Sequence, residues 1–75
     1  MYSRRDCHLC QEAYALLSRL RDEAPTNLSL EVVDVDASAD LRQRYGHEVP
    51  VLLVNGKKFD KIRFNEPRLR RRLGL

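Results

Sequence analysis

The chain has 75 residues, of which 43% are hydrophobic and 33% are charged, with 14 Lys and Arg against 11 Asp and Glu. This length predicts one domain over residues 1–75, and only three glycines and three prolines exclude a low-complexity composition. The longest strictly apolar run, Val51 to Val54, is far shorter than the roughly 18 residues of a membrane helix. We expect no membrane contact. The polar residues after Met1 predict no signal peptide and therefore a cytoplasmic location.

Basic residues gather towards the C-terminus. Residues 57–75 hold eight basic and two acidic side chains, a net charge of +6, whereas residues 1–56 carry a net charge of −3. A basic end is compatible with nucleic acid or with an acidic partner. No aromatic residue is interleaved with the run Arg68 to Arg72 to stack on bases, so we expect a solvated helix face and no nucleic-acid partner.

The first half of the chain predicts a strand, a helix and a second strand. The first strand is Met1 to Ser3. From Cys10 onward apolar residues recur at helical spacing until Pro25, at positions Ala13, Leu16, Leu17, Leu20 and Ala24. The β-branched, partly alternating residues 28–35 (LSLEVVDV) predict the next strand. These three elements indicate a parallel βαβ unit.

The second half predicts two more helices and a hairpin. The elements are a short helix capped by Asp36 or Ser38, a buried strand at 49–54, a turn at Asn55-Gly56, a strand at 57–64 and a helix capped by Asn65. Asn-Gly between two extended runs is the strongest short hairpin signal. The predicted fold class is therefore α/β with the order βαβαββα. It comprises a four-stranded mixed sheet flanked by three helices, which lie on both faces.

Two cysteines, Cys7 and Cys10, stand at the start of the first predicted helix in the motif CHLC. A disulfide that closes so short a loop adds only about 2 kcal/mol to the free energy of unfolding, so it stabilises the fold weakly. A helix N-terminus stabilises a thiolate, and Arg4 and Arg5 can add to that positive field. The motif predicts Cys7 as the exposed nucleophile and Cys10 as the resolving thiol. His8 either stabilises the thiolate as an imidazolium or lies in solvent with little influence.

Other interpretations of the motif stay open at this point. One is a passive disulfide, and another is a zinc site built from Cys7, Cys10, His8 and His47. Structural zinc sites usually show a second, regularly spaced ligand pair, whereas His47 stands alone. Copper-chaperone domains have two strands between their two helices, where this chain predicts one. We expect no bound metal or cofactor, and the alternative function is a metal- or iron–sulfur-carrying module that uses the same cysteines.

Four segments together resemble the small glutaredoxin-like proteins of the thioredoxin superfamily over nearly the whole chain: CHLC, VDVD (Val33 to Asp36), Val49-Pro50 and VNGK (Val54 to Lys57). The resemblance implies a thioredoxin/glutaredoxin-like fold and a thiol–disulfide oxidoreductase that acts on protein or glutathione mixed disulfides. It also implies a cis Pro50 that faces the dithiol, and a Val49 backbone that pairs with the substrate's cysteine. Arg5 and His8 are further candidates for substrate binding.

The chain also departs from that family. Glutaredoxins that use glutathione commonly carry Gly-Gly-x-Asp before the last helix, where this sequence has Arg63-Phe64-Asn65-Glu66. We expect a monomer whose partner is either a disulfide-containing protein or glutathione, and no cofactor other than glutathione as a co-substrate. Glu48 replaces the threonine of many relatives and places a negative charge near the substrate groove. The first strand is central in that fold, so Met1 to Ser3 is either a truncated strand or follows a translation start further upstream.

Overall fold

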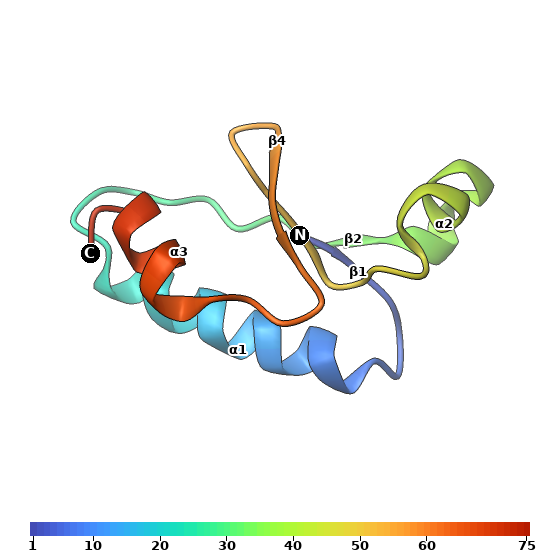
Figure 1. Ribbon diagram of the computed structural model, residues 1–75, viewed down its shortest axis with the longest axis horizontal. Coiled ribbons are helices and arrows are strands. Elements are labelled where there is room, and N and C mark those ends of the chain that lie inside the picture. The colour runs from blue at the N-terminus through green and yellow to red at the C-terminus, as the bar shows by residue number, and fades with distance from the viewer.

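The computed structural model describes residues 1–75 (Figure 1). Its elements are β1 (Tyr2–Ser3), α1 (His8–Glu23), β2 (Val33–Asp34), the 3₁₀ turn η1 (Val35–Ala37), α2 (Ala39–Tyr45), β3 (Val51–Val54), β4 (Lys57–Lys61) and α3 (Glu66–Arg72). The predicted order βαβαββα is confirmed, and the four strands form one mixed sheet. None of the helices combines the length and the apolar character that crossing a bilayer requires.

The sheet has the strand order β2-β1-β3-β4, so β1 is a central strand. Tyr2 pairs with Val33 in the parallel ladder to β2 and with Val51 in the antiparallel ladder to β3. The hairpin between β3 and β4 turns at Asn55-Gly56, where φ is 52° and 81°. A two-residue hairpin turn of type I′ requires positive φ at both central residues, and Asn-Gly adopts this conformation readily.

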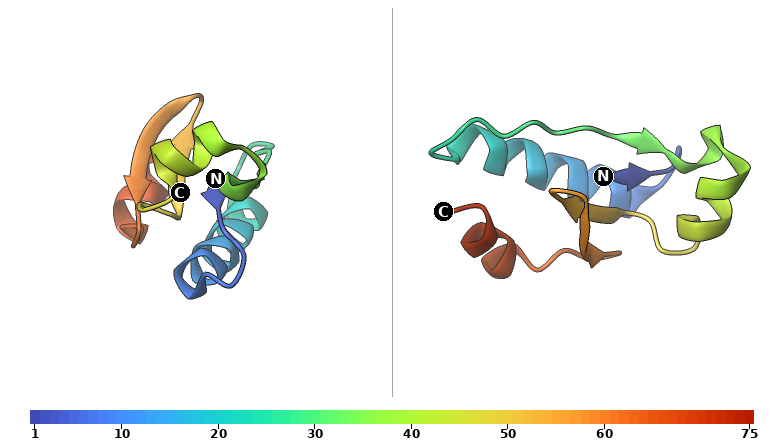
Figure 2. Two further views of the ribbon diagram at one scale, coloured as in Figure 1. Left: turned by 90° about the vertical axis from the view of Figure 1, so that its right-hand side faces the viewer. Right: turned by 90° about the horizontal axis from the view of Figure 1, so that it is seen from above.

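The main core lies between two helices and one face of the sheet. It consists of Leu17 and Leu20 from α1, Leu52 from β3 and Leu69 from α3. Successive residues of a strand point to opposite faces, so Val51 and its partner Tyr2 belong to the other face. There the Tyr2 ring stacks on Tyr45 of α2, with the ring centroids 4.4 Å apart. Figures 1 and 2 show α2 at the far end of the molecule from α3 and the C-terminus.

The second strand is shorter than residues 28–35 predicted, because only Val33–Asp34 pair with a neighbour. Its partner β1 offers just two residues, and the ladder ends where the Val33 N–H donates to the Met1 carbonyl at 2.9 Å. Strand propensity without a partner strand does not make a ladder. After Asp34, at the C-terminal end of β2, the chain turns into η1, because Asp34 Oδ1 accepts from the Asp36 N–H at 2.9 Å.

Side-chain caps start the two later helices. Ser38 caps α2, its Oγ accepting from the Leu41 N–H at 3.4 Å, so of the two predicted candidates Asp36 is not the cap. Asn65 caps α3 as predicted, and its Oδ1 accepts from the Arg68 N–H at 3.0 Å. Both caps satisfy N–H groups that a helix start leaves unpaired.

The basic C-terminal helix is only partly the solvated face that its sequence predicted. Arg70 lies between two carboxylates, with its Nε 3.0 Å from Glu66 Oε2 and its Nη2 3.1 Å from Glu23 Oε2. Arg68 covers the ring of Phe59 at 4.2 Å from the centroid and donates to the Phe59 carbonyl at 2.8 Å. These contacts bind α3 to α1 and to β4.

Candidate redox site

Cys7 and Cys10 lie at the N-terminus of α1. Cys7 is the N-cap, with extended backbone (φ −104°, ψ 107°), and its Sγ accepts a hydrogen bond from the Cys10 N–H at 3.1 Å. The two residues are joined as a disulfide with their Cα atoms 5.2 Å apart. Cys10 is 2% exposed on the buried face of the helix, whereas Cys7 is only half-buried. A nucleophile at Cys7 and a resolving thiol at Cys10 require this order of exposure.

The positive field at this site comes from α1 itself. The first turn of the helix holds no acidic residue, and the Cys10 N–H donates to Cys7 Sγ. Arg4, expected to reinforce that field, is held elsewhere: its guanidinium binds Asp36 and the Gly46 carbonyl. Arg5 is exposed and has no ion pair or hydrogen bond within the chain. Arg5 is therefore the basic side chain near the motif that remains free for a partner.

The two histidines are not brought to the sulfurs. The His8 side chain is 83% exposed, and its Nε2 lies 3.2 Å from Glu12 Oε1, one turn further along α1. His47 is exposed between α2 and β3. No group of three or more His, Cys, Asp or Glu side chains in residues 1–75 is close enough to hold a metal ion. The four-ligand set considered for zinc is thus not assembled in this structure.

The Val49–Pro50 peptide bond is cis and leads into β3. Pro50 is fully buried, and its carbonyl accepts from the Ile62 N–H at 2.8 Å. Val49 is half-buried, and neither its N–H nor its C=O takes part in a backbone hydrogen bond within the chain. Unused backbone donors and acceptors next to a strand are able to pair with an added strand.

Glu48 does not present the free negative charge that the sequence predicted. Its two carboxylate oxygens lie 2.8 Å from Lys58 Nζ and 3.1 Å from Lys61 Nζ. These two hydrogen bonds hold the pKa of Glu48 below its ordinary value. Both lysines belong to β4, so side chains of that strand offset the negative charge of Glu48 in the loop before Pro50.

Ile62 is a site feature that sequence patterns did not indicate. The extended run 57–64 predicts Ile62 within a strand, but β4 ends at Lys61, because Ile62 has a φ of 66°. Left-handed backbone is rare for a β-branched residue, so no propensity signal marks this position. Ile62 is also 40% exposed. Its position beside Pro50, fixed by the hydrogen bond to the Pro50 carbonyl, becomes visible only in the folded chain.

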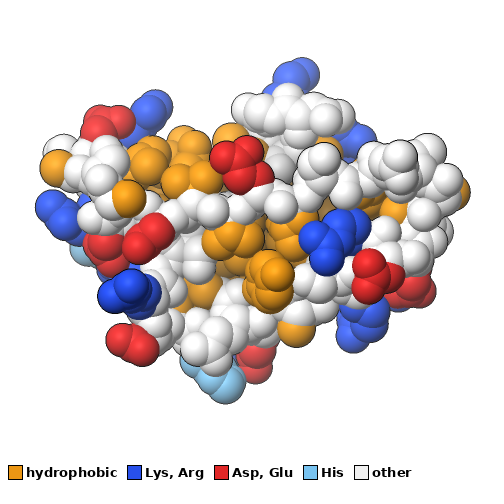
Figure 3. Space-filling model, turned by 180° about the vertical axis from the view of Figure 1, so that it is seen from behind, with side chains coloured by type: hydrophobic (Ala, Val, Ile, Leu, Met, Phe, Trp, Pro, Cys, Tyr) orange, Lys and Arg blue, Asp and Glu red, His pale blue; other side chains and the backbone are white.

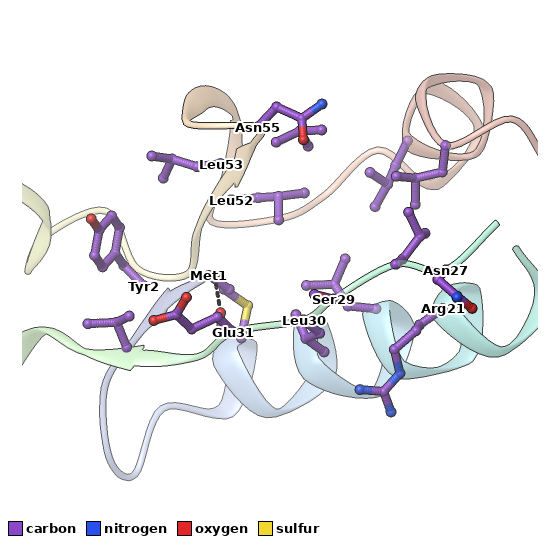
Figure 4. Close-up of a pocket in the computed structure, with 16 residues that line it drawn as sticks. Met1, Tyr2, Arg21, Asn27, Ser29, Leu30, Glu31, Leu52, Leu53 and Asn55 are labelled. Atoms are coloured by element: carbon purple, nitrogen blue, oxygen red, sulfur yellow. Dashed lines mark hydrogen bonds between the residues drawn. The ribbon is translucent and has the colours of Figure 1, made fainter.

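A hollow of about 470 Å³ lies away from the cysteines, between residues 27–31 and β3 (Figure 4). Within its lining the Met1 amino group donates to the Glu31 carbonyl at 2.6 Å. Residues 28–30 make no backbone hydrogen bond, and β3 pairs with β1 only at Val51. The hollow therefore lies between residues 27–31 and β3, where the short strand β1 does not bridge them. Neither cysteine lines it.

The family assignment follows from comparison with known proteins. The family model described as Glutaredoxin-like domain (DUF836) matches residues 1–74. The X-ray structure of the Northeast Structural Genomics target protein XcR50 from X. campestris superposes with a TM-score of 0.77. That protein is 36% identical, and the match covers 97% of this chain and 91% of that one. The comparison with curated proteins gives no significant match. The chain therefore belongs to the glutaredoxin-like proteins of the thioredoxin superfamily, and its Cys7–Cys10 pair fits a thiol redox role.

Proposed function

We propose that the protein is a thiol–disulfide oxidoreductase that reduces disulfides in polypeptides or in glutathione adducts. The observation that carries the proposal is the position of Cys7 as the N-cap of α1, one turn before the buried Cys10. Unpaired N–H groups and the positive end of the helix dipole favour the thiolate over the thiol at such a position. A thiolate is the species that attacks disulfides.

The reaction consists of two exchanges. The Cys7 thiolate attacks one sulfur of the substrate disulfide, a mixed disulfide forms, and the other substrate sulfur leaves as a thiolate that takes up a proton. Cys10 then loses its proton and attacks the Cys7 sulfur, which forms the Cys7–Cys10 disulfide and releases the second substrate thiol. Two electrons pass from the protein dithiol to the substrate. A thiol reductant, either glutathione or a dithiol reductase, returns the protein to the reduced state.

Two further residues are assigned to substrate binding. The unused backbone groups of Val49 suit an extended substrate segment that adds to β3 as a short strand, which orients the substrate disulfide. Arg5 is exposed and unpaired, and it suits a carboxylate of the substrate near the dithiol. We assign no direct role in the exchange to His8, because its ring is engaged by Glu12.

The test is a pair of cysteine variants assayed with a glutathionylated peptide. Cys7→Ser is expected to reduce turnover to the uncatalysed rate, because Ser offers no thiolate. Cys10→Ser is expected to accumulate a mixed disulfide, visible by intact-mass spectrometry as the protein plus one substrate thiol. Assays driven by glutathione with its reductase, and in parallel by thioredoxin with its reductase, identify the electron donor. Turnover that survives in Cys7→Ser contradicts the assignment.

A further inference from the structure

The arginines of α3 have two different environments. Arg70 is neutralised by Glu66 and Glu23, with nitrogen–oxygen distances of 3.0 Å and 3.1 Å. The other three are exposed and have no carboxylate within ion-pair distance, and we call them the outer arginines: Arg68, Arg71 and Arg72. One side of a short helix therefore carries positive charge that the chain itself does not offset.

The outer arginines share one face of α3. Residues three and four apart on a helix are neighbours, so Arg68, Arg71 and Arg72 form one stripe, about 6 Å long between its first and last member. Leu69 and Leu73 lie on the other side of the helix and pack in the core. Like charges at this spacing repel one another and destabilise a helix. The stripe is therefore not explained by the stability of α3.

Arg68 is held in place where a cation is unfavourable. It belongs to the first turn of α3, next to the positive end of the helix dipole. Its guanidinium nevertheless lies 4.2 Å from the centroid of the Phe59 ring and donates to the Phe59 carbonyl at 2.8 Å. A side chain held in this way loses little conformational freedom when an anion binds to it. The dipole accounts for arginines in the last turn of a helix, but not for one in the first.

The stripe is separate from the dithiol. α3 is bound to α1 through Arg19 and Glu23, which follow Cys7 by 12 and 16 residues and so lie about 18 Å and 24 Å further along the helix axis. Figure 1 shows α3 beside the C-terminal half of α1. On the face behind that view, basic and acidic side chains are interspersed around an apolar centre (Figure 3). The uncompensated stripe is thus a local feature of α3.

We propose that the outer arginines dock an acidic segment of a partner polypeptide, with carboxylates about 6 Å apart, the axial spacing of residues four apart on a helix. An arginine fork binds a carboxylate through two parallel N–H···O bonds, which gives such a contact geometric specificity. This interaction surface is additional to the proposed oxidoreductase function and does not rest on it. It holds a partner near the protein while the dithiol stays accessible.

Two other anionic partners fit the stripe less well. Three cations are fewer than the roughly six to ten phosphate contacts of a typical nucleic-acid interface. The Phe59 ring packs against the core and is covered by Arg68, so it offers no face to a base. A membrane surface needs apolar side chains that insert beside the cations, whereas the leucines of α3 face the core.

The experiment is fluorescence anisotropy with a labelled Ala-rich helical peptide that carries Glu residues four positions apart, and with the same peptide carrying Gln instead. We expect the wild type to bind the Glu peptide about tenfold more tightly than the Gln peptide. Arg71→Gln/Arg72→Gln is expected to weaken binding of the Glu peptide about fivefold, because two exposed ion pairs are lost. Its Tm and its turnover of a glutathionylated peptide should not change.

The matched control is Arg42→Gln/Arg44→Gln, which removes the same charge from α2 at the far end of the molecule. It should leave the Kd of the Glu peptide unchanged. Equal weakening in both double variants, or equal binding of the Glu and Gln peptides, overturns the surface. A twelve-nucleotide oligothymidine or a phosphatidylserine vesicle that binds the stripe more tightly than the Glu peptide overturns the choice of partner. Cys7→Ser should bind the Glu peptide as the wild type does, so failure of the oxidoreductase assignment leaves this result separate.

Discussion

Arg4 connects three segments that are distant in the sequence, and its removal is a direct test of how this small fold is held together. Its Nε and Nη2 lie 3.0 Å and 3.1 Å from the two carboxylate oxygens of Asp36 in η1. Its Nη1 donates to the Gly46 carbonyl at the end of α2 at 3.2 Å. Arg4→Ala removes all three hydrogen bonds at once, and with them a direct link from the end of β1 to η1 and α2.

The size of the effect follows from burial. The side chains of Arg4 and Asp36 are 34% and 39% exposed, so solvent screens the ion pair and its contribution is about 0.5–1 kcal/mol. The partly buried hydrogen bond from a charged donor to the Gly46 carbonyl adds about 1 kcal/mol. We therefore expect Arg4→Ala to lower the free energy of unfolding by about 1.5–2 kcal/mol. In a domain of this size that corresponds to a decrease in Tm of about 6–16 °C.

The assay is urea unfolding followed by far-UV circular dichroism, because the chain has no tryptophan to report by fluorescence. A double-mutant cycle with Asp36→Asn should give a coupling energy of about 0.5–1 kcal/mol. Arg4→Lys is the matched control, since it keeps the charge and loses the two-pronged geometry, and it should recover less than half of the lost stability. A loss below about 0.5 kcal/mol in Arg4→Ala, or no coupling to Asp36, refutes this account.

Three other predictions test the remaining structural claims. Glu48→Gln should flatten the decline of Tm as pH falls from about 5 to about 3. The pKa of Glu48 is lowered in the folded state, so its carboxylate stabilises the fold at pH values above the ordinary pKa and loses that effect as pH falls through the folded pKa. Equal Tm profiles for the variant and the wild type contradict the ion pair. Leu20→Ala, at a fully buried position, should cost about 2–5 kcal/mol in urea unfolding, and a loss below about 1 kcal/mol contradicts the core described here. In hydrogen exchange followed by NMR, the amides of residues 28–30 should exchange much faster than that of Val33, which is bonded to the first strand; similar protection would show an additional ladder.

Local signals in the sequence predicted much of the fold. The order of the elements and the mixed sheet follow from helical spacing, extended runs and the turn at Asn55-Gly56, each of which acts over a few residues. The Asn65 cap and the position of Cys7 at a helix start are local in the same sense. The candidate redox centre was predictable because both of its cysteines come from a single helix start.

What the sequence determined by itself is therefore the set of elements and the dithiol at the head of α1. Only the tertiary structure decided that β2 is cut to the length of its partner, and that Arg4 binds groups 32 and 42 positions away. It also decided that β4 neutralises Glu48 and that Ile62 leaves its strand in a left-handed turn beside Pro50. Each of these features depends on contacts between distant segments. Propensity and spacing carry no information about which distant groups meet.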